Sequence, residues 1–245
     1  MDTIDNKEKT PDSEVEDVLE EDSGVNEEFV EELAVEESPG DESQDIEVVI
    51  EESQIKELQV REAQPDYNKR YTYTDYLTWD DDERWELIDG VPYMMSAPSW
   101  QHQGILGNLH LLFGSFLKGK KCKVFFAPYD VRLNADTFDN TVVQPDLVIV
   151  CDRSKYMDTG YVGAPELVVE VLSPSTSRYD QTIKYDAYLR AGVREFWVVD
   201  LVNKTLAVHL LKDGVYITHA YIKDDIVYVS VLEGCKIDLA EVFEE

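Results

Sequence analysis

The sequence has few cysteines and no long apolar run. Its three cysteines, Cys122, Cys151 and Cys235, are widely spaced and form no CxxC pair. This usage predicts neither a disulfide framework nor a structural zinc site, and it favours a reducing compartment. No apolar run approaches the roughly 20 residues that a membrane helix needs, and no basic segment followed by an apolar core opens the chain. We therefore expect a soluble, cytoplasmic protein with no membrane contact.

Aromatic residues and positive charges are scarce in the first 66 residues. This segment has one Phe, whereas all four Trp and all fourteen Tyr of the chain lie after it. It holds 25 acidic and 4 basic residues, so it carries −21 of the total charge of −30. Such a composition cannot bury enough apolar surface to offset chain entropy. We expect residues 1–66 to form an acidic, mostly disordered arm and residues 67–245 to form the folded domain.

The folded region is rich in strand patterns, with few helices between them. The stretch "RWELIDGVPYMM" predicts a hairpin whose strands, Arg84–Ile88 and Val91–Met95, meet at an Asp89-Gly90 turn. Apolar residues at helical spacing predict an amphipathic helix from Ser99 to Leu117. A second helix is expected in "SRYDQTIKYDAYLRAGV", where Gly192 ends it.

Further strands are expected on both sides of this second helix. Single strands are predicted for "KVFFAPYDVRLN", "TVVQPDLVIVCD", "PELVVEVLSPST" and "REFWVVD", followed by antiparallel strands around an Asp213-Gly214 turn. This order of elements predicts an α/β fold, with a central mixed β-sheet flanked by helices and an added antiparallel hairpin region at the C-terminal end.

Four charged residues interrupt otherwise apolar structure. Glu170 lies inside the apolar run "LVVEVL", and Asp146 directly precedes the apolar run "LVIVC". Charged side chains are seldom buried without a partner, so Glu170 needs a cation nearby. The other two are Glu86 and Lys184. Simpler interpretations exist for three of them: Glu86 could face water on its hairpin strand, Asp146 could cap a strand start, and Lys184 could lie on a solvated helix face.

The two strand-borne carboxylates together predict a metal site. Asp146 and Glu170 are 24 residues apart, which allows their strands to be neighbours with both side chains at one end of the sheet. Two converging carboxylates repel unless a cation lies between them. Oxygen-only ligands suit Mg²⁺ or Mn²⁺ better than zinc. Such an ion can activate water and polarise a phosphoryl oxygen, and a nearby lysine can stabilise the charge that develops on phosphate.

The same residues resemble a known family. The stretches "WELIDG", "QPDLVIV", "ELVVEVLSPST" and "YDQTIKYDAYLRAGVREFWVVD" are similar to those of the Uma-two-type restriction endonuclease family, a branch of the PD-(D/E)xK nuclease superfamily. The resemblance covers about Tyr71 to Phe243. It implies a restriction-endonuclease-like core and a Mg²⁺- or Mn²⁺-dependent endonuclease that hydrolyses DNA phosphodiester bonds.

The resemblance also assigns roles to single residues. It matches Pro145-Asp146 to the PD element, Glu170 to the (D/E)xK acid, and Glu86 to the acidic residue near the start of the core. Asp146, Glu170 and Glu86 are then the implied metal ligands, with the Val171 carbonyl as a further one. His102, at the start of the Ser99–Leu117 helix, fits a histidine position of the family, or it is a helix-start residue that bonds a neighbouring strand.

The sequence departs from the superfamily pattern at one position. Leu172 stands two residues after Glu170, where the superfamily has its lysine, and Lys184 on the following helix is the family match. Asp180 lies four residues before Lys184, so the two can pair on one helix face. Lys184 is therefore either the catalytic lysine or the partner of Asp180.

Other functions compete with a nuclease. Residues 67–245 carry a net charge of −9, the difference between −30 and −21. Because DNA affinity rests on Lys and Arg, this acidity favours an inert nuclease-fold module that binds nucleic acid or protein partners. A carboxylate-pair glycosidase would leave Lys184 without a role, and no glycine-rich phosphate loop supports a nucleotide-binding enzyme. A homodimer would supply the two sites that a double-strand cut needs.

Overall fold

The computed structural model describes residues 65–79, 83–173 and 180–244, all within one compact unit of the chain. The predicted acidic arm, apart from its last two residues, lies outside these described residues. So do residues 177–179 at the start of the second predicted helix.

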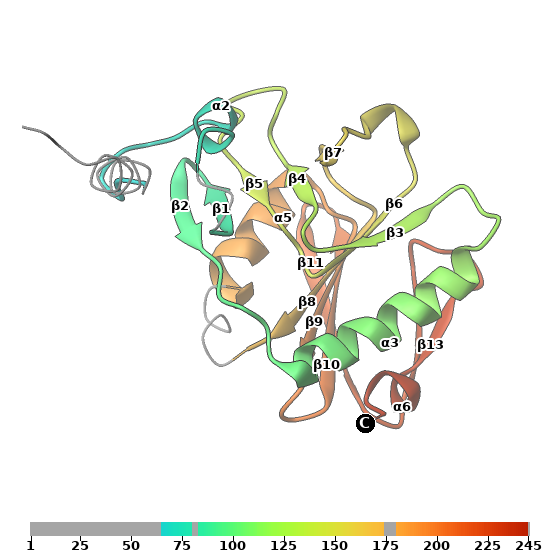
Figure 1. Ribbon diagram of the computed structural model, residues 1–245. Coiled ribbons are helices and arrows are strands. Elements are labelled where there is room, and N and C mark those ends of the chain that lie inside the picture. The colour runs from blue at the N-terminus through green and yellow to red at the C-terminus, as the bar shows by residue number, and fades with distance from the viewer. Residues whose placement is uncertain (1–64, 80–82, 174–179, 245) are drawn as a thin grey trace, which may run out of the picture. The chain divides into compact units, whose positions relative to one another are not determined.

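A mixed six-stranded sheet forms the centre of the fold (Figure 1). Its order is β11-β10-β9-β8-β6-β3, and β8 and β9 are parallel whereas the other neighbours are antiparallel. The predicted α/β class with a central mixed sheet is confirmed. The strands are β3 (Lys123–Phe126), β6 (Leu147–Val150), β8 (Leu167–Leu172), β9 (Glu195–Asp200), β10 (Thr205–Lys212) and β11 (Val215–Ile222).

A second sheet of five short strands has the order β2-β1-β5-β4-β7. The predicted hairpin is its β1-β2 pair, and both turn residues have positive φ, 51° at Asp89 and 76° at Gly90. A separate pair, β12 and β13, completes the described strands. Their bounds are β1 (Trp85–Ile88), β2 (Val91–Met94), β4 (Asp130–Arg132), β5 (Val142–Val143), β7 (Gly160–Val162), β12 (Ile226–Tyr228) and β13 (Lys236–Asp238).

Two segments predicted as single strands are each divided between the two sheets. The first gives β3 and β4 with Pro128 between them, and the second gives β5 and β6 with Pro145 between them. Proline has no N–H for a ladder hydrogen bond, so each strand ends there and the chain changes sheet. The two breaks lie side by side, because Ala127 N donates to Asp146 O at 3.2 Å. The sheets therefore separate at Asp146.

Helices cover both faces of the central sheet. The predicted Ser99–Leu117 helix is α3 (Trp100–Leu117), with Ser99 as its N-cap. Leu109 and Phe113 of α3 pack with Val169 and Trp197 on one face, and Tyr188 packs with Val168 on the other. The remaining helices are α2 (Tyr73–Tyr76), α5 (Tyr185–Ala191), α6 (Leu239–Val242), a 3-10 turn (Arg153–Lys155) and a π-helical turn (Asp180–Lys184).

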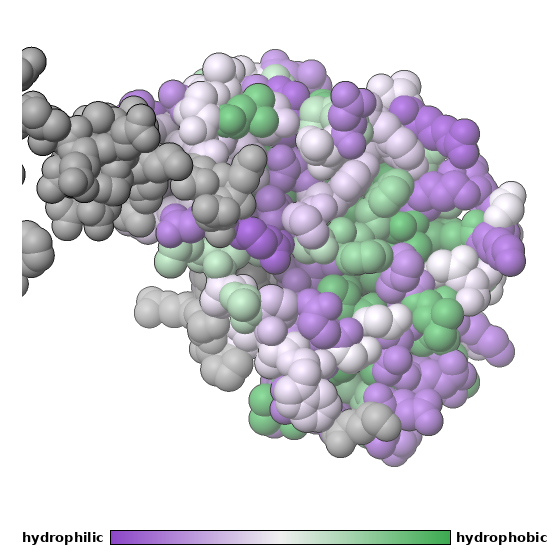
Figure 2. Space-filling model, viewed as in Figure 1, coloured by the Kyte–Doolittle hydropathy of each residue, from purple (hydrophilic) through white to green (hydrophobic). Residues whose placement is uncertain are grey.

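Apolar side chains gather on the surface over β3 and α3 (Figure 2). Leu111 of α3 and Phe126 of β3 are among the exposed large hydrophobic residues. None of the helices in residues 65–79, 83–173 and 180–244 has both the length and the apolar character that a bilayer span requires.

Cys122 and Cys151 form a disulfide, which the sequence analysis did not predict. The cause is the antiparallel pairing of β3 with β6, in which Lys123 lies opposite Val150. The residues flanking this pair, Cys122 and Cys151, are therefore opposite each other although 29 positions separate them in the chain. This bond removes the cysteine-based argument for a reducing compartment.

Candidate active site

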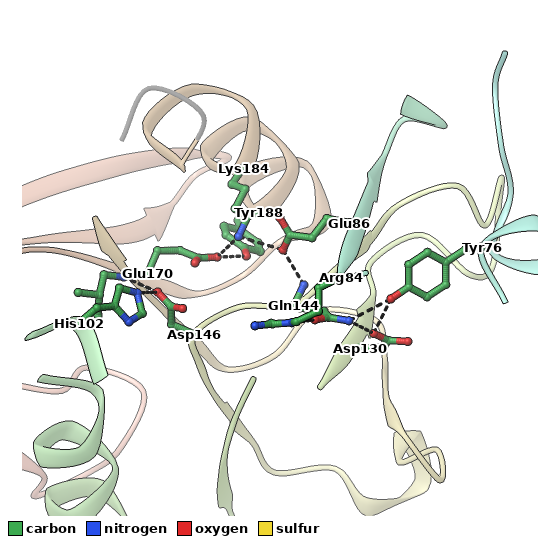
Figure 3. Close-up of polar contacts among 11 residues, drawn as sticks. Tyr76, Arg84, Glu86, His102, Asp130, Gln144, Asp146, Glu170, Lys184 and Tyr188 are labelled. Atoms are coloured by element: carbon green, nitrogen blue, oxygen red, sulfur yellow. Dashed lines mark hydrogen bonds and ion pairs between the residues drawn. The ribbon is translucent and has the colours of Figure 1, made fainter. Parts of the chain in front are cut away.

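A buried lysine links two buried glutamates between the sheets. Lys184 Nζ lies 2.9 Å from Glu86 Oε1 and 2.9 Å from Glu170 Oε1 (Figure 3). At most 2% of each of these three residues is exposed. Glu86 Oε1 also accepts from Gln144 N at 2.7 Å, and Glu170 Oε1 accepts from Tyr188 Oη at 2.6 Å. A buried charge is costly without such partners, so the cluster stabilises itself by mutual contact.

Four elements deliver these side chains. Glu86 comes from β1, and Glu170 from β8 of the central sheet. Lys184 ends the π-helical turn, and Tyr188 lies four residues later in α5, so both reach the same carboxylate. Single π turns within helices are rare, but those that occur are often at functional sites. The predicted second helix is therefore present, but its first described turn is π-helical.

Asp146 forms a second contact group next to this cluster. Leu147 pairs with Val169, so the continued register places Asp146 opposite Glu170 at the sheet edge. Asp146 Oδ2 accepts from Val171 N at 2.7 Å and lies 3.0 Å from His102 Nε2. Val171 N is a backbone donor of the strand that carries Glu170. The carboxylate of Asp146 is therefore fixed to β8 on one side and to the first turn of α3 on the other.

All five of these predicted residues line one cleft of about 1260 Å³. The cleft lies where the two sheets separate, and Ala127 also lines it. The side chain of Asp146 keeps 17% of its surface exposed, more than Glu86, Glu170 or Lys184. Asp146 is therefore the predicted carboxylate most accessible to a ligand in the cleft. The five predicted residues that line the cleft are Glu86, His102, Asp146, Glu170 and Lys184.

A hydrogen-bond network that the sequence analysis missed leads away from Glu86. Gln144 Nε2 donates to Tyr76 Oη and to Asp130 Oδ1, each at 3.0 Å, and Tyr76 Oη donates to the same Asp130 oxygen (Figure 3). Burial raises the pKa of Asp130, although the hydrogen bonds from Gln144 and Tyr76 act in the opposite direction. On its other side, Gln144 Oε1 accepts from the Arg84 guanidinium.

The sequence contained weak signals for the missed residues. Tyr188 is four residues after Lys184, which places it on the same helix face. The hydrogen-bonding role of its hydroxyl has no sequence signature. Gln144 lies between β5 and the Pro145-Asp146 element, and that placement depends on the strand break. Asp180 has its backbone in the π turn, and its side chain is outside the described residues.

The donor atoms near Asp146 have the chemistry that Mg²⁺ or Mn²⁺ prefers. Asp146 and Glu170 provide carboxylate oxygens from adjacent strands, and hard divalent ions bind oxygen. Asp146 Oδ2 already accepts from Val171 N, whereas Oδ1 accepts no hydrogen bond within the part of the chain that the structure describes. In that same part, no group of three His, Cys, Asp or Glu side chains is arranged to hold a metal ion. The residues therefore fit an ion held by two carboxylates rather than a closed protein cage.

The model of the Uma2 family, described as "Putative restriction endonuclease", matches residues 73–240. The chain belongs to this family. The family resemblance noted from the sequence motifs is thereby confirmed. The match spans the described strands of both sheets and all the described residues that line the cleft except Tyr67.

Two known proteins are similar to this Uma2 member. A crystal structure from Anabaena variabilis, described as a putative nuclease belonging to DUF820, superposes with a TM-score of 0.59. The two sequences are 18% identical, and the superposition covers 71% of this chain and 97% of the Anabaena chain. The two proteins therefore share a fold. Protein slr1290 of Synechocystis is 34% identical over 116 residues, which are 46% of this chain and 60% of that protein.

Proposed function

We propose that this Uma2-family protein is a metal-dependent endonuclease that hydrolyses DNA phosphodiester bonds. The observation that supports this function most directly is the convergence of Asp146, Glu170 and Lys184 in one cleft at the point where the two sheets separate. Two carboxylates beside a lysine combine metal ligands with a cation that can stabilise charge on phosphate.

Asp146 and Glu170 are the proposed ligands of Mg²⁺ or Mn²⁺, with Glu86 and the Val171 carbonyl as further ligands. The ion would polarise a phosphoryl oxygen and lower the pKa of a water molecule. Glu86 has a second role that its contacts support, because its Oε1 lies 2.9 Å from Lys184 Nζ and so holds the lysine in place. His102 holds the Asp146 carboxylate through the contact between Nε2 and Oδ2.

Lys184 is the proposed catalytic lysine. Its ammonium group lies between Glu86 and Glu170 and carries three N–H donors. A donor fixed in this way can orient the attacking water or contact the phosphate oxygen on which charge develops. These contacts with two cleft carboxylates favour catalysis over a role confined to pairing with Asp180.

Purified protein incubated with plasmid DNA and Mg²⁺ or Mn²⁺ tests this function. We expect the wild type to cleave and Asp146→Asn to cleave at least about 100-fold more slowly, because a metal ligand loses its charge. Asp139→Asn is the matched control, since Asp139 pairs with Arg132 outside the cleft. Equal cleavage by wild type and Asp146→Asn would reject the site.

The inert nuclease-fold module remains the alternative, favoured by the net charge of −9 on residues 67–245. It predicts no cleavage and no binding of Mg²⁺ or Mn²⁺ by calorimetry. A cytoplasmic location, and a homodimer that brings two clefts to one duplex, are further parts of the proposal. Sedimentation with and without duplex DNA measures the oligomeric state.

A further inference from the structure

Among the described residues, Arg84 is the cleft cation that forms no ion pair with a carboxylate. Arg84 and Lys184 are the two Lys or Arg residues among the described residues that line the cleft. Lys184 contacts two carboxylates, Glu86 and Glu170. No ion pair joins Arg84 to a carboxylate of residues 65–79, 83–173 or 180–244. Of the two described cations of the cleft, Arg84 is therefore the one that an entering anion meets without an ion-paired carboxylate.

A neutral amide holds the Arg84 guanidinium. Nε and Nη2 donate to Gln144 Oε1 at 3.2 and 2.9 Å (Figure 3). These two bonds orient the planar group but leave its charge intact, since an amide oxygen carries no net charge. The guanidinium has five N–H donors in a fixed fork, so donors remain for a further acceptor. The backbone is also fixed, because Met95 N donates to Arg84 O at 2.8 Å.

Asp130 determines which end of the Gln144 amide faces Arg84. Gln144 Nε2 must point toward Asp130 and Tyr76, because the carboxylate oxygen is an acceptor only. The amide oxygen then points the other way, toward the guanidinium. Gln144 and Asp130 are 8% and 9% exposed, so a buried network supports this orientation. Within the network, Gln144 lies between the carboxylate of Asp130 and Arg84.

We propose that Arg84 binds a DNA backbone phosphate in the cleft beside Asp146 and Glu170. Arg binds phosphate well because its fork matches two phosphate oxygens at once. This assignment rests on the proposed nuclease function and names the group that positions its substrate. It also gives an acidic domain a local means of binding DNA.

Fluorescence anisotropy of a labelled 20-base-pair duplex in EDTA, over a series of salt concentrations, measures this contact without turnover. We expect Arg84→Met to bind about tenfold more weakly than wild type. The slope of log affinity against log salt should fall by about one for the lost phosphate contact. Arg84→Lys keeps the charge and should recover most of the affinity. Arg190→Met is the control, because Arg190 is exposed and pairs with Asp89 outside the cleft.

A purely structural role for Arg84 predicts a different result. The variants would then lose thermal stability, while their salt slope would equal that of the wild type. Arg84→Gln provides a second uncharged variant, with a polar group against Gln144, should Arg84→Met fail to fold. Wild-type affinity in a folded uncharged variant would overturn the assignment, as would an equal loss in Arg190→Met.

The outcomes separate this assignment from the nuclease proposal. DNA binding that depends on Arg84, with no cleavage in Mg²⁺ or Mn²⁺, would support the phosphate contact and reject the nuclease. If the wild type cleaves DNA but the Arg84 variants bind DNA as tightly as it does, the nuclease proposal would be supported and the phosphate contact rejected. A wild type that neither binds DNA nor cleaves it in Mg²⁺ or Mn²⁺ would overturn both.

Discussion

Two glutamates on neighbouring parallel strands are both buried, yet they have different surroundings. Glu170 of β8 is 2% exposed, and Glu195 of β9 is fully buried. Lys184 and Tyr188 contact Glu170 with charged and phenolic donors. Glu195 instead accepts from Trp197 Nε1 at 2.8 Å and from Val231 N at 3.0 Å. Glu170 lines the cleft, whereas Glu195 does not.

The difference shows that burial alone does not separate a carboxylate that lines the cleft from one in the core. Glu195 lies at the start of β9, opposite Leu167, and Glu170 lies three residues further along, opposite Val198. Glu195 is held by neutral donors of the core, which suits a structural role. Glu170 is held by a lysine that also contacts Glu86, beside a cleft that can admit a ligand. The type of donor and access to the cleft distinguish the two.

The largest expected effect on cleavage comes from Glu170→Gln. The substitution replaces the carboxylate of a proposed metal ligand by a neutral amide, and Lys184 loses one of its two carboxylate partners. Cleavage should therefore fall at least about 100-fold. Glu195→Gln is the matched variant and should cleave within about threefold of wild type, because Glu195 is outside the cleft. Initial rates on plasmid DNA measure both. A similar loss in both variants would contradict the distinction.

A smaller effect is expected from Tyr188→Phe. This change removes the hydroxyl that donates to Glu170 Oε1 at 2.6 Å and leaves the ring packed. Loss of a group that orients a metal ligand typically costs about 10- to 100-fold, so we expect slower cleavage and a higher metal concentration for half-maximal rate. The metal titration is the decisive measurement.

Tyr216→Phe is the control for this variant. It also removes a tyrosine hydrogen bond, from Tyr216 Oη to Val193 O at 2.9 Å, but outside the cleft. The Tyr216 variant should keep the wild-type metal dependence. Identical metal titrations for the two Tyr→Phe variants would show that Tyr188 only packs.

Local patterns predicted the elements that carry the site. The apolar run around Glu170 and the helical spacing from Ser99 to Leu117 each depend on near neighbours in the chain, and β8 and α3 appear where expected. The Asp89-Gly90 turn is likewise local. The family motifs brought Asp146 and Lys184 forward as candidates, and the structure places both in the cleft.

The remaining features depend on contacts between distant residues. Nothing near Pro128 or Pro145 in the sequence indicates that the chain changes sheet there, because an edge strand can also end at a proline. The Cys122–Cys151 disulfide requires the β3-β6 register, which no spacing reveals. The contact of Gln144 with Arg84 joins residues 60 positions apart and depends on the placement of β5.

Glu195→Gln should have the smallest effect on cleavage. Its effect on stability should be measurable and should depend on pH. Burial raises the pKa of Glu195 above its usual 4.5, while the donors from Trp197 and Val231 oppose this shift. The stability that the protonated form contributes is complete below pH 4.5. It is lost as pH rises through the raised pKa of the folded state.

Glutamine stays neutral throughout this range, so the Glu195→Gln variant does not lose this contribution to stability. The melting temperature of the variant minus that of the wild type should therefore increase as pH rises from 4.5, and level off above the pKa of the folded state. Thermal unfolding followed by circular dichroism at a series of pH values measures this difference. A difference that is constant would mean that the donors cancel the effect of burial on the pKa, and one that falls with pH would mean that they stabilise Glu195 as an anion. The contrast with Glu170 would then rest on access to the cleft alone.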